Sequence, residues 1–147
     1  MDRHEELEAI DRVIVDLYRS ICFEKGETPP LELLRQVFMP GAKMINNDAD
    51  DPAIRTPEDY IEGFMGFMEE LQFESFHEID IAHRTDLFGK IAQRFSTSET
   101  RLSLDDAEPL NTGINSIQLI KTNGEWRITC MVWNNQTPKR PIPEQYL

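Results

Sequence analysis

Apolar residues recur every three or four positions in three stretches of the chain, and this spacing predicts three amphipathic helices. The helices are expected over residues 5–24, 30–38 and 57–71. Thr56 and Pro57 give the third helix a strong start, because threonine caps an N-terminus and proline fits the first turn. Each helix has an apolar stripe that must pack against another surface.

Later in the chain the pattern changes to alternation of apolar and polar positions, which predicts β-strands. The expected strands are a short one over residues 42–45, two long ones over 74–88 and 90–104, and the two arms of 112–134. Asn123-Gly124 closes the last stretch as a type I′ turn, because both residues tolerate the positive φ that this turn requires. This order predicts an α+β fold, with the N-terminal helices packed on one face of a strongly curved antiparallel sheet. Such a sheet forms a cone with an internal pocket.

Counting outward from the turn assigns each residue of the 112–134 hairpin to one face of the sheet, since side chains alternate along a strand. The inward face is expected to hold Asn115, Ile117, Leu119, Ile128, Cys130 and Val132. The outward face is expected to hold Ile114, Ile120, Met131 and Trp133. An apolar face of this kind is rarely exposed only to water, so the sequence predicts a homodimer through the outer face of the sheet.

In the other two long strands, the apolar residues predict which face points inward, and polar residues share that face. In the 90–104 strand, Ile91 and Phe95 predict an inward face that also includes Glu99 and Arg101. The opposite face of that strand, with Arg94, Ser96, Ser98 and Thr100, is too polar for an expected core. In the 74–88 strand, Ile79 and Ile81 predict an inward face that also includes His77 and His83.

Composition narrows the range of partners and compartments. The chain has 147 residues, enough for one domain with a full core, and a net charge of −12 argues against nucleic acid or an anionic membrane surface as partner. Its start has no signal-peptide pattern and no stretch is long enough to span a membrane, so a cytoplasmic protein is expected. Cys22 and Cys130 lie among apolar neighbours and are expected to be buried, reduced thiols. The proline-rich tail, residues 138–147, is expected to be extended.

Five stretches resemble the nuclear transport factor 2-like (cystatin-like) superfamily, in particular its SnoaL-like members and their uncharacterised bacterial relatives. These stretches are IDRVIVDLYRSICFEKG, FMPGAKMIN, TPEDYIEGFMGFM, FGKIAQRFSTSETR and GINSIQLIKTNGEWRITCMVWN. The resemblance covers the chain from about Leu7 to Tyr146 and implies the α+β cone over a single domain, residues 1–147. It implies no single activity, because the superfamily includes isomerases, dehydratases, hydrolases, cyclases and non-catalytic domains.

Polar residues on the predicted inward faces supply the candidate chemistry. His83, Glu99 and Arg101 are the candidate catalytic residues, because histidine exchanges protons near neutral pH and an acid–arginine pair can orient water. The alternative is a salt bridge between Glu99 and Arg101 at the rim of the cone, with His83 exposed at a strand end. The candidate ligand-binding residues are Tyr18, Phe38, Phe64, Phe95 and Asn115. Asn115 has a second interpretation, as a structural residue that satisfies backbone groups.

Metal and cofactor sites are not expected. Asp48, Asp50 and Asp59 match three ligand positions of a calcium loop, but Ala53 stands where that loop needs glycine. The expected function is therefore binding of a small molecule in an apolar pocket. Two alternatives stay open: a cofactor-independent lyase, isomerase or hydrolase acting on a small apolar or cyclic metabolite, and a non-catalytic dimerisation domain.

Overall fold

The structure is a computed structural model that describes residues 1–147. Its helices are α1 (Arg3–Arg19), α2 (Glu32–Val37), α3 (Pro57–Glu70) and a short 3-10 helix, η1 (Glu144–Tyr146). Its strands are β1 (Phe38–Asn46), β2 (Ala53–Arg55), β3 (His77–Phe88), β4 (Ile91–Arg101), β5 (Asn111–Thr122) and β6 (Glu125–Asn135). The six strands form one sheet in the order β2-β1-β6-β5-β4-β3.

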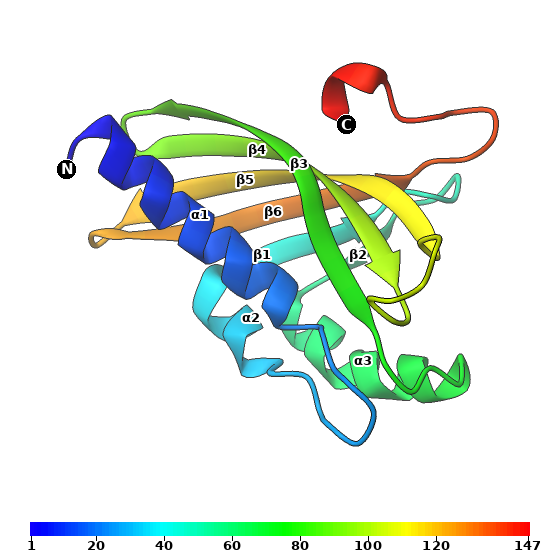
Figure 1. Cartoon of the computed structure of the whole chain (residues 1–147). Coiled ribbons are helices and arrows are strands. Elements are labelled where there is room, and N and C mark those ends of the chain that lie inside the picture. The colour runs from blue at the N-terminus through cyan, green and yellow to red at the C-terminus, as the bar shows by residue number, and fades with distance from the viewer.

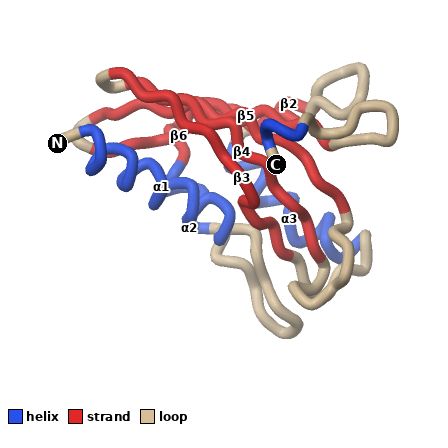
Figure 2. The backbone as a smooth tube through the Cα atoms, turned by 45° about the horizontal axis from the view of Figure 1, so that its top comes forward, coloured by secondary structure: helices blue, strands red, loops and turns tan.

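The helices lie on one face of the sheet, called here the inner face, and the C-terminal segment lies on the other, the outer face (Figure 1). The strands curve strongly, and β3 and β4 bend toward the end of the molecule where α3 lies (Figure 2). The main hydrophobic core fills the space between the helices and the inner face, with Ile10, Leu34, Ile117 and Ile128 fully buried. The predicted α+β arrangement is confirmed, with one parallel strand pair, β1 with β6, in an otherwise antiparallel sheet.

Helix starts follow the sequence closely, whereas the predicted helix ends run too far. Asp2 caps α1 and Thr56 caps α3, each in a capping box with an acidic residue three positions on. The first helix ends at Arg19, and the second ends at Val37, because Phe38 is already part of β1. No helix of the chain is long and apolar enough to cross a membrane.

The β5–β6 hairpin has the predicted turn, with φ of 52° at Asn123 and 80° at Gly124. Pairing follows the predicted register from the turn as far as Leu119 opposite Ile128. A β-bulge at Thr129 then inserts one extra residue into β6, so that Cys130 lies opposite Gln118. Beyond the bulge every β6 side chain changes face.

This bulge makes four face assignments wrong. Met131 is buried and Trp133 packs against the core, although the sequence predicted both on the outer face. Cys130 and Val132 are only partly buried, although the sequence predicted both in the core. Ile114 and Ile120 are partly buried, as residues of the outer face can be. The predicted outer apolar surface therefore loses Met131 and Trp133.

The face prediction for β4 is reversed. Ala92, Arg94, Ser96, Ser98 and Thr100 are buried, whereas Ile91 and Phe95 are exposed. The polar inner face is stable because its side chains find buried partners: the Tyr18 hydroxyl lies 2.6 Å from Ser96 Oγ, and Arg94 pairs with Asp11 of α1. Polarity therefore misled the prediction, because the polar groups are satisfied by residues far away in the sequence.

A second bulge separates the two ends of β3. Asp80 pairs with Ser98 and Ala82 with Thr97, so Ile81 is the extra residue. His77 and His83 were both predicted on the inward face, but the bulge puts them on opposite faces, with His83 opposite Ser96 on the inner face and His77 opposite Arg101. It also leaves Glu78 and Thr100 paired on the inner face, where Glu78 lines a cavity.

Candidate functional site

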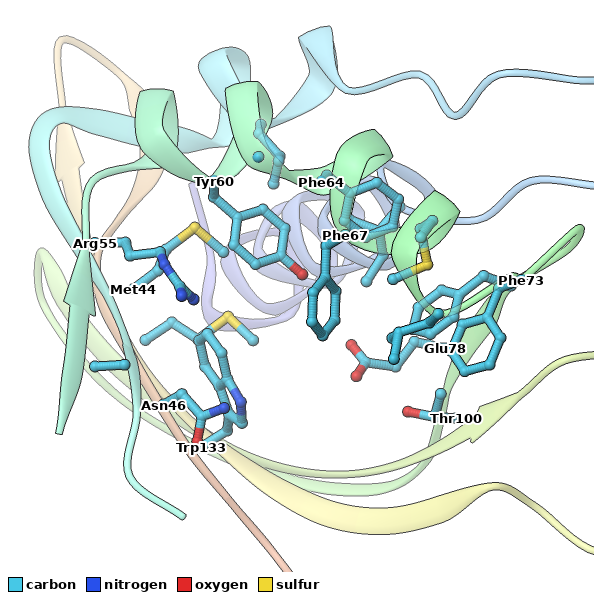
Figure 3. Close-up of a pocket in the computed structure, with 18 of the residues that line it drawn as sticks. Met44, Asn46, Arg55, Tyr60, Phe64, Phe67, Phe73, Glu78, Thr100 and Trp133 are labelled. Atoms are coloured by element: carbon cyan, nitrogen blue, oxygen red, sulfur yellow. The ribbon is translucent and has the colours of Figure 1, made fainter. Parts of the chain in front are cut away.

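A cavity of about 770 Å³ lies between α3 and the inner face of the sheet. Hydrophobic residues make up 15 of the 28 residues that line it, so its walls are mainly apolar. Aromatic side chains form much of the lining: Tyr60, Phe64, Phe67, Phe73, Phe76 and Trp133. Figure 3 shows Tyr60 and Phe67 projecting from α3 into the cavity, with Trp133 of β6 across from them. A volume of this size is typical of small-molecule sites.

The aromatic lining follows from the period of α3. Tyr60, Phe64 and Phe67 are spaced four and three residues apart, which places them on one face of the helix. Phe64 is buried against Phe23 and Phe76, with ring centroids 6.3 and 5.9 Å away. Phe67 is 54% exposed and Leu71 is 42% exposed, although both line the cavity, so they stand at its mouth.

Glu78 brings a carboxylate into this apolar cavity. Its side chain points from β3 into the space below Phe67 (Figure 3) and makes no hydrogen bond or ion pair. Its backbone N–H donates to Cys22 Sγ, with 3.5 Å between nitrogen and sulfur. Burial away from water raises the pKa of Glu78 from 4.5 to about 7, because the charged form is poorly solvated there.

A buried hydrogen-bond network forms the floor of the cavity. Asn115 Nδ2 donates to the Tyr18 hydroxyl at 2.8 Å and to Ser98 Oγ at 3.3 Å. The Tyr18 hydroxyl is also within 2.6 Å of Ser96 Oγ. Burial raises the pKa of the Tyr18 phenol, so this group stays protonated at neutral pH. The network fixes Asn115, whose side chain also lines the cavity.

The five predicted ligand-binding residues occupy different places. Phe64 and Asn115 line the cavity, and Tyr18 lies one hydrogen bond behind Asn115. Phe38 is a buried core residue that does not line the cavity. Phe95 lies on the outer face, where its ring packs 5.2 Å from Tyr146, so its predicted place in the pocket is wrong.

The three predicted catalytic residues do not line the cavity. Glu99 and Arg101 form an ion pair of 3.3 Å, and Arg101 also donates to the backbone carbonyl of Asp106. This is the rim salt bridge of the alternative interpretation. The His83 side chain is 46% exposed, lies 3.1 Å from Asp80 and does not line the cavity. The predicted inward positions of Glu99 and Arg101 are wrong because the β4 face is reversed, whereas His83 lies on the inner face opposite Ser96 but outside the cavity.

Glu78, Tyr60, Arg55 and Trp133 line the cavity but were missed as site residues. The periodicity of α3 carried a signal for Tyr60, which shares an apolar stripe with Phe64. Trp133 was misplaced by the bulge at Thr129, which leaves no mark in the residue pattern. Glu78 alternates with Ile79 on β3, and counting apolar positions put it on the outer face. No group of three or more His, Cys, Asp or Glu side chains is arranged to hold a metal ion.

Comparison with known proteins relates the chain to others through structure. No protein-family model matches the sequence. No curated protein matches it either. A nuclear transport factor 2-like protein of unknown function from Shewanella baltica has a similar structure, with a TM-score of 0.69 and 14% identity over 93% of this chain and 98% of that one.

Two further solved structures are about as similar in backbone structure, again at low sequence identity. A protein of unknown function with a cystatin-like fold from Nostoc punctiforme has a TM-score of 0.70 and 15% identity, over 96% of this chain and 97% of that one. The structure of LinA has a TM-score of 0.69 and 9% identity, over 92% of this chain and 88% of that one. The chain therefore has the nuclear transport factor 2-like, or cystatin-like, fold.

Proposed function

We propose that the protein binds a small molecule with a mainly apolar body in the cavity between α3 and the inner face of the sheet. The observation that carries this proposal is the cavity itself, about 770 Å³ in volume and lined by aromatic side chains around one carboxylate, that of Glu78. Natural ligand sites combine apolar walls with a few polar groups in the same way. The similar structures support the fold, and the SnoaL-like grouping remains a prediction.

Gly63 offers a way to block the cavity without disturbing its walls. It lies on α3 among the lining residues, and a Cβ at this position would have no atom within 4 Å. A leucine side chain there has room to extend toward the cavity mouth. Gly63→Ala is the matched control, because it adds one carbon and favours the helix by roughly 0.5–1 kcal/mol.

The first experiment is native mass spectrometry of the protein purified from cells, followed by a screen of small molecules by calorimetry. We expect a co-purifying molecule or a screened binder, with affinity reduced about tenfold or more in Gly63→Leu and retained in Gly63→Ala. Absence of any binder contradicts the proposal. So does a binder whose affinity is the same in wild type and Gly63→Leu.

A second candidate function, proton-transfer catalysis without a cofactor, is favoured by the pKa of Glu78. Its value of about 7 leaves both the acid and the carboxylate populated at neutral pH, as a general acid or base requires. In this role Glu78 takes the place of His83, Glu99 and Arg101. The ligand would present an acidic C–H to the Glu78 carboxylate, which takes the proton, or a leaving group to the protonated form, which donates one; lyase or isomerase chemistry fits such a step.

The test of catalysis uses a bound compound that the wild-type protein converts. We expect Glu78→Gln to lower kcat by roughly 10²–10⁴-fold, because glutamine fills the same space but cannot exchange a proton. His83→Gln is the control and should leave kcat unchanged, since His83 lies outside the cavity. Unaltered turnover in Glu78→Gln would rule out this role while leaving ligand binding intact.

A further inference from the structure

The residues that line the cavity carry charges of mainly one sign. Asp59, Glu62 and Glu70 of α3 line it near the mouth, and Glu78 lines it inside. The only cationic side chain in the lining is Arg55 of β2. Figure 3 shows Arg55 and Glu78 on opposite sides of the cavity, with Tyr60 and Phe67 between them. Four carboxylates against one guanidinium favour entry of positive charge.

Glu78 is half-buried and lacks the partner that a carboxylate with little access to water normally has. Buried charges in proteins are usually paired with a cation or with several hydrogen-bond donors. The Glu78 carboxylate has neither, and no lysine, arginine or histidine lies within ion-pair distance of it. Its free oxygens face the cavity, so a ligand could supply the missing positive charge.

The walls around Glu78 are suited to the same kind of ligand. Aromatic faces attract cations through the negative charge of their π-systems, and tryptophan and tyrosine are the most effective. Phe67 lies next to Glu78 in Figure 3, and Tyr60 and Trp133 line the same cavity. Aromatic cages with one acidic residue are a common way to recognise an organic ammonium group.

We propose that the ligand class is an organic cation, an amine or quaternary ammonium compound, with its charged group at Glu78 and its apolar body along the aromatic side chains of α3. This inference rests on the proposed function, because it concerns the same cavity. It excludes an anion as the preferred ligand, since the Glu78 carboxylate would repel it. A bare metal ion is a poor alternative, because no group of three or more His, Cys, Asp or Glu side chains is arranged to hold one.

Three probes of similar size and different charge test the inference: 2-phenylethylammonium, 2-phenylethanol and 3-phenylpropanoate. Their affinities are measured by calorimetry at about pH 8, where Glu78 is mainly ionised. We expect the ammonium probe to bind wild type about tenfold more tightly than the alcohol, and the carboxylate probe to bind weakest. Glu78→Gln should bring the ammonium and alcohol affinities within about twofold of each other.

Glu70→Gln is the matched control, because Glu70 lines the cavity but is exposed. It should change the preference for the ammonium probe by less than about threefold. Equal binding of the alcohol and the ammonium probe by wild type overturns the cation inference and keeps the proposed function. A preference that persists in Glu78→Gln also overturns it. Failure of all three probes to bind counts against the cavity function itself.

Discussion

A carboxyl group that folds into an apolar cavity makes stability depend on pH. In the unfolded chain Glu78 has its ordinary pKa of 4.5, and in the folded protein the pKa is about 7. Between these values the folded state keeps a proton that the unfolded state has released, so the free energy of unfolding falls as pH rises. Above about pH 7 this loss of stability is complete, and below about pH 4.5 there is none.

Glu78→Gln removes this titration and should therefore stabilise the protein at high pH. We expect the free energy of unfolding to rise by about 1–3 kcal/mol relative to wild type at pH 8, and to change little at pH 4. Urea denaturation at several pH values measures the difference. The neighbouring Cys22, Tyr18 and Tyr60 have pKa values raised by burial, so they stay neutral over this range.

Exposed Glu70 again provides the control, and Glu70→Gln should show no comparable gain at pH 8. A gain in Glu78→Gln that is equal at pH 4 and pH 8 would mean that Glu78 ionises normally in the folded state. The acid–base role proposed for Glu78 would then lose its main support, whereas the cavity and its aromatic walls would be unaffected.

At the scale of elements, the bulge at Thr129 decides which residues of β6 line the cavity. Met131 is 6% exposed and lines the cavity, whereas Val132 lies opposite Ser116 on the outer face. Met131→Thr should cost about 2–4 kcal/mol of stability, because it removes buried apolar atoms and buries a hydroxyl. Val132→Thr should cost less than about 1 kcal/mol. Chemical denaturation of both variants distinguishes the two registers, since an unbulged β6 would reverse their order.

Elements whose signals are local could be predicted from the sequence, and long-range features could not. Asn123-Gly124 defines the hairpin turn and Thr56 defines the start of α3, because each depends on its immediate neighbours. The buried face of β4 depends on Tyr18 and Asn115, which are 78 and 17 residues away from their partners on that strand. Counting apolar residues cannot detect such partners, so the sequence placed Phe95 inside and Ser96 outside.

The residues of the candidate site divide in the same way: those whose face depends on a local pattern were predicted, and Glu78 was not. Phe64 was correctly placed because the helical period of α3 fixes its face, and Asn115 was correctly placed because the bulge lies in β6 and leaves the alternation of β5 unbroken. Glu78 was not, since a lone acid next to Ile79 in an alternating strand has the pattern of a solvent-facing residue. Only the fold around it, with α3 on one side and β4 on the other, makes that acid a half-buried group that lines a cavity.

At the scale of the whole molecule, the C-terminal segment folds back onto the outer face of the sheet rather than over the cavity mouth (Figure 1). Thr97 Oγ1 donates to the backbone carbonyl of Tyr146 at 2.6 Å, and the Tyr146 ring packs against Phe95. This contact makes Thr97 one of the buried residues of β4. The segment thereby covers the part of the outer face around Phe95 and leaves the far end of the same face uncovered.

The uncovered end carries an apolar cluster that is unusual for a surface in contact only with water. Phe88 is 82% exposed and Ile91 is 60% exposed, and they pair with each other across β3 and β4. Ile91 also pairs with Ile120 of β5, so the three side chains lie next to one another. Single exposed apolar residues are common, whereas adjacent ones indicate a contact surface. We therefore keep the predicted homodimer as a proposal, with Phe88, Ile91 and Ile120 in place of Met131 and Trp133.

A second copy of the chain is the expected partner of this cluster, because a self-complementary patch generates a closed dimer with two-fold symmetry. Light scattering should give twice the monomer mass for wild type at micromolar concentration and the monomer mass for Ile91→Glu. Val15→Glu is the control, since Val15 of α1 is also 60% exposed but lies on the helix side of the sheet, and it should remain dimeric. A monomeric wild type contradicts the proposal, and so does a dimer that persists in Ile91→Glu.

Trp133→Glu distinguishes the cavity from the proposed dimer surface. It should weaken ligand binding without changing the mass measured by light scattering, because Trp133 lines the cavity.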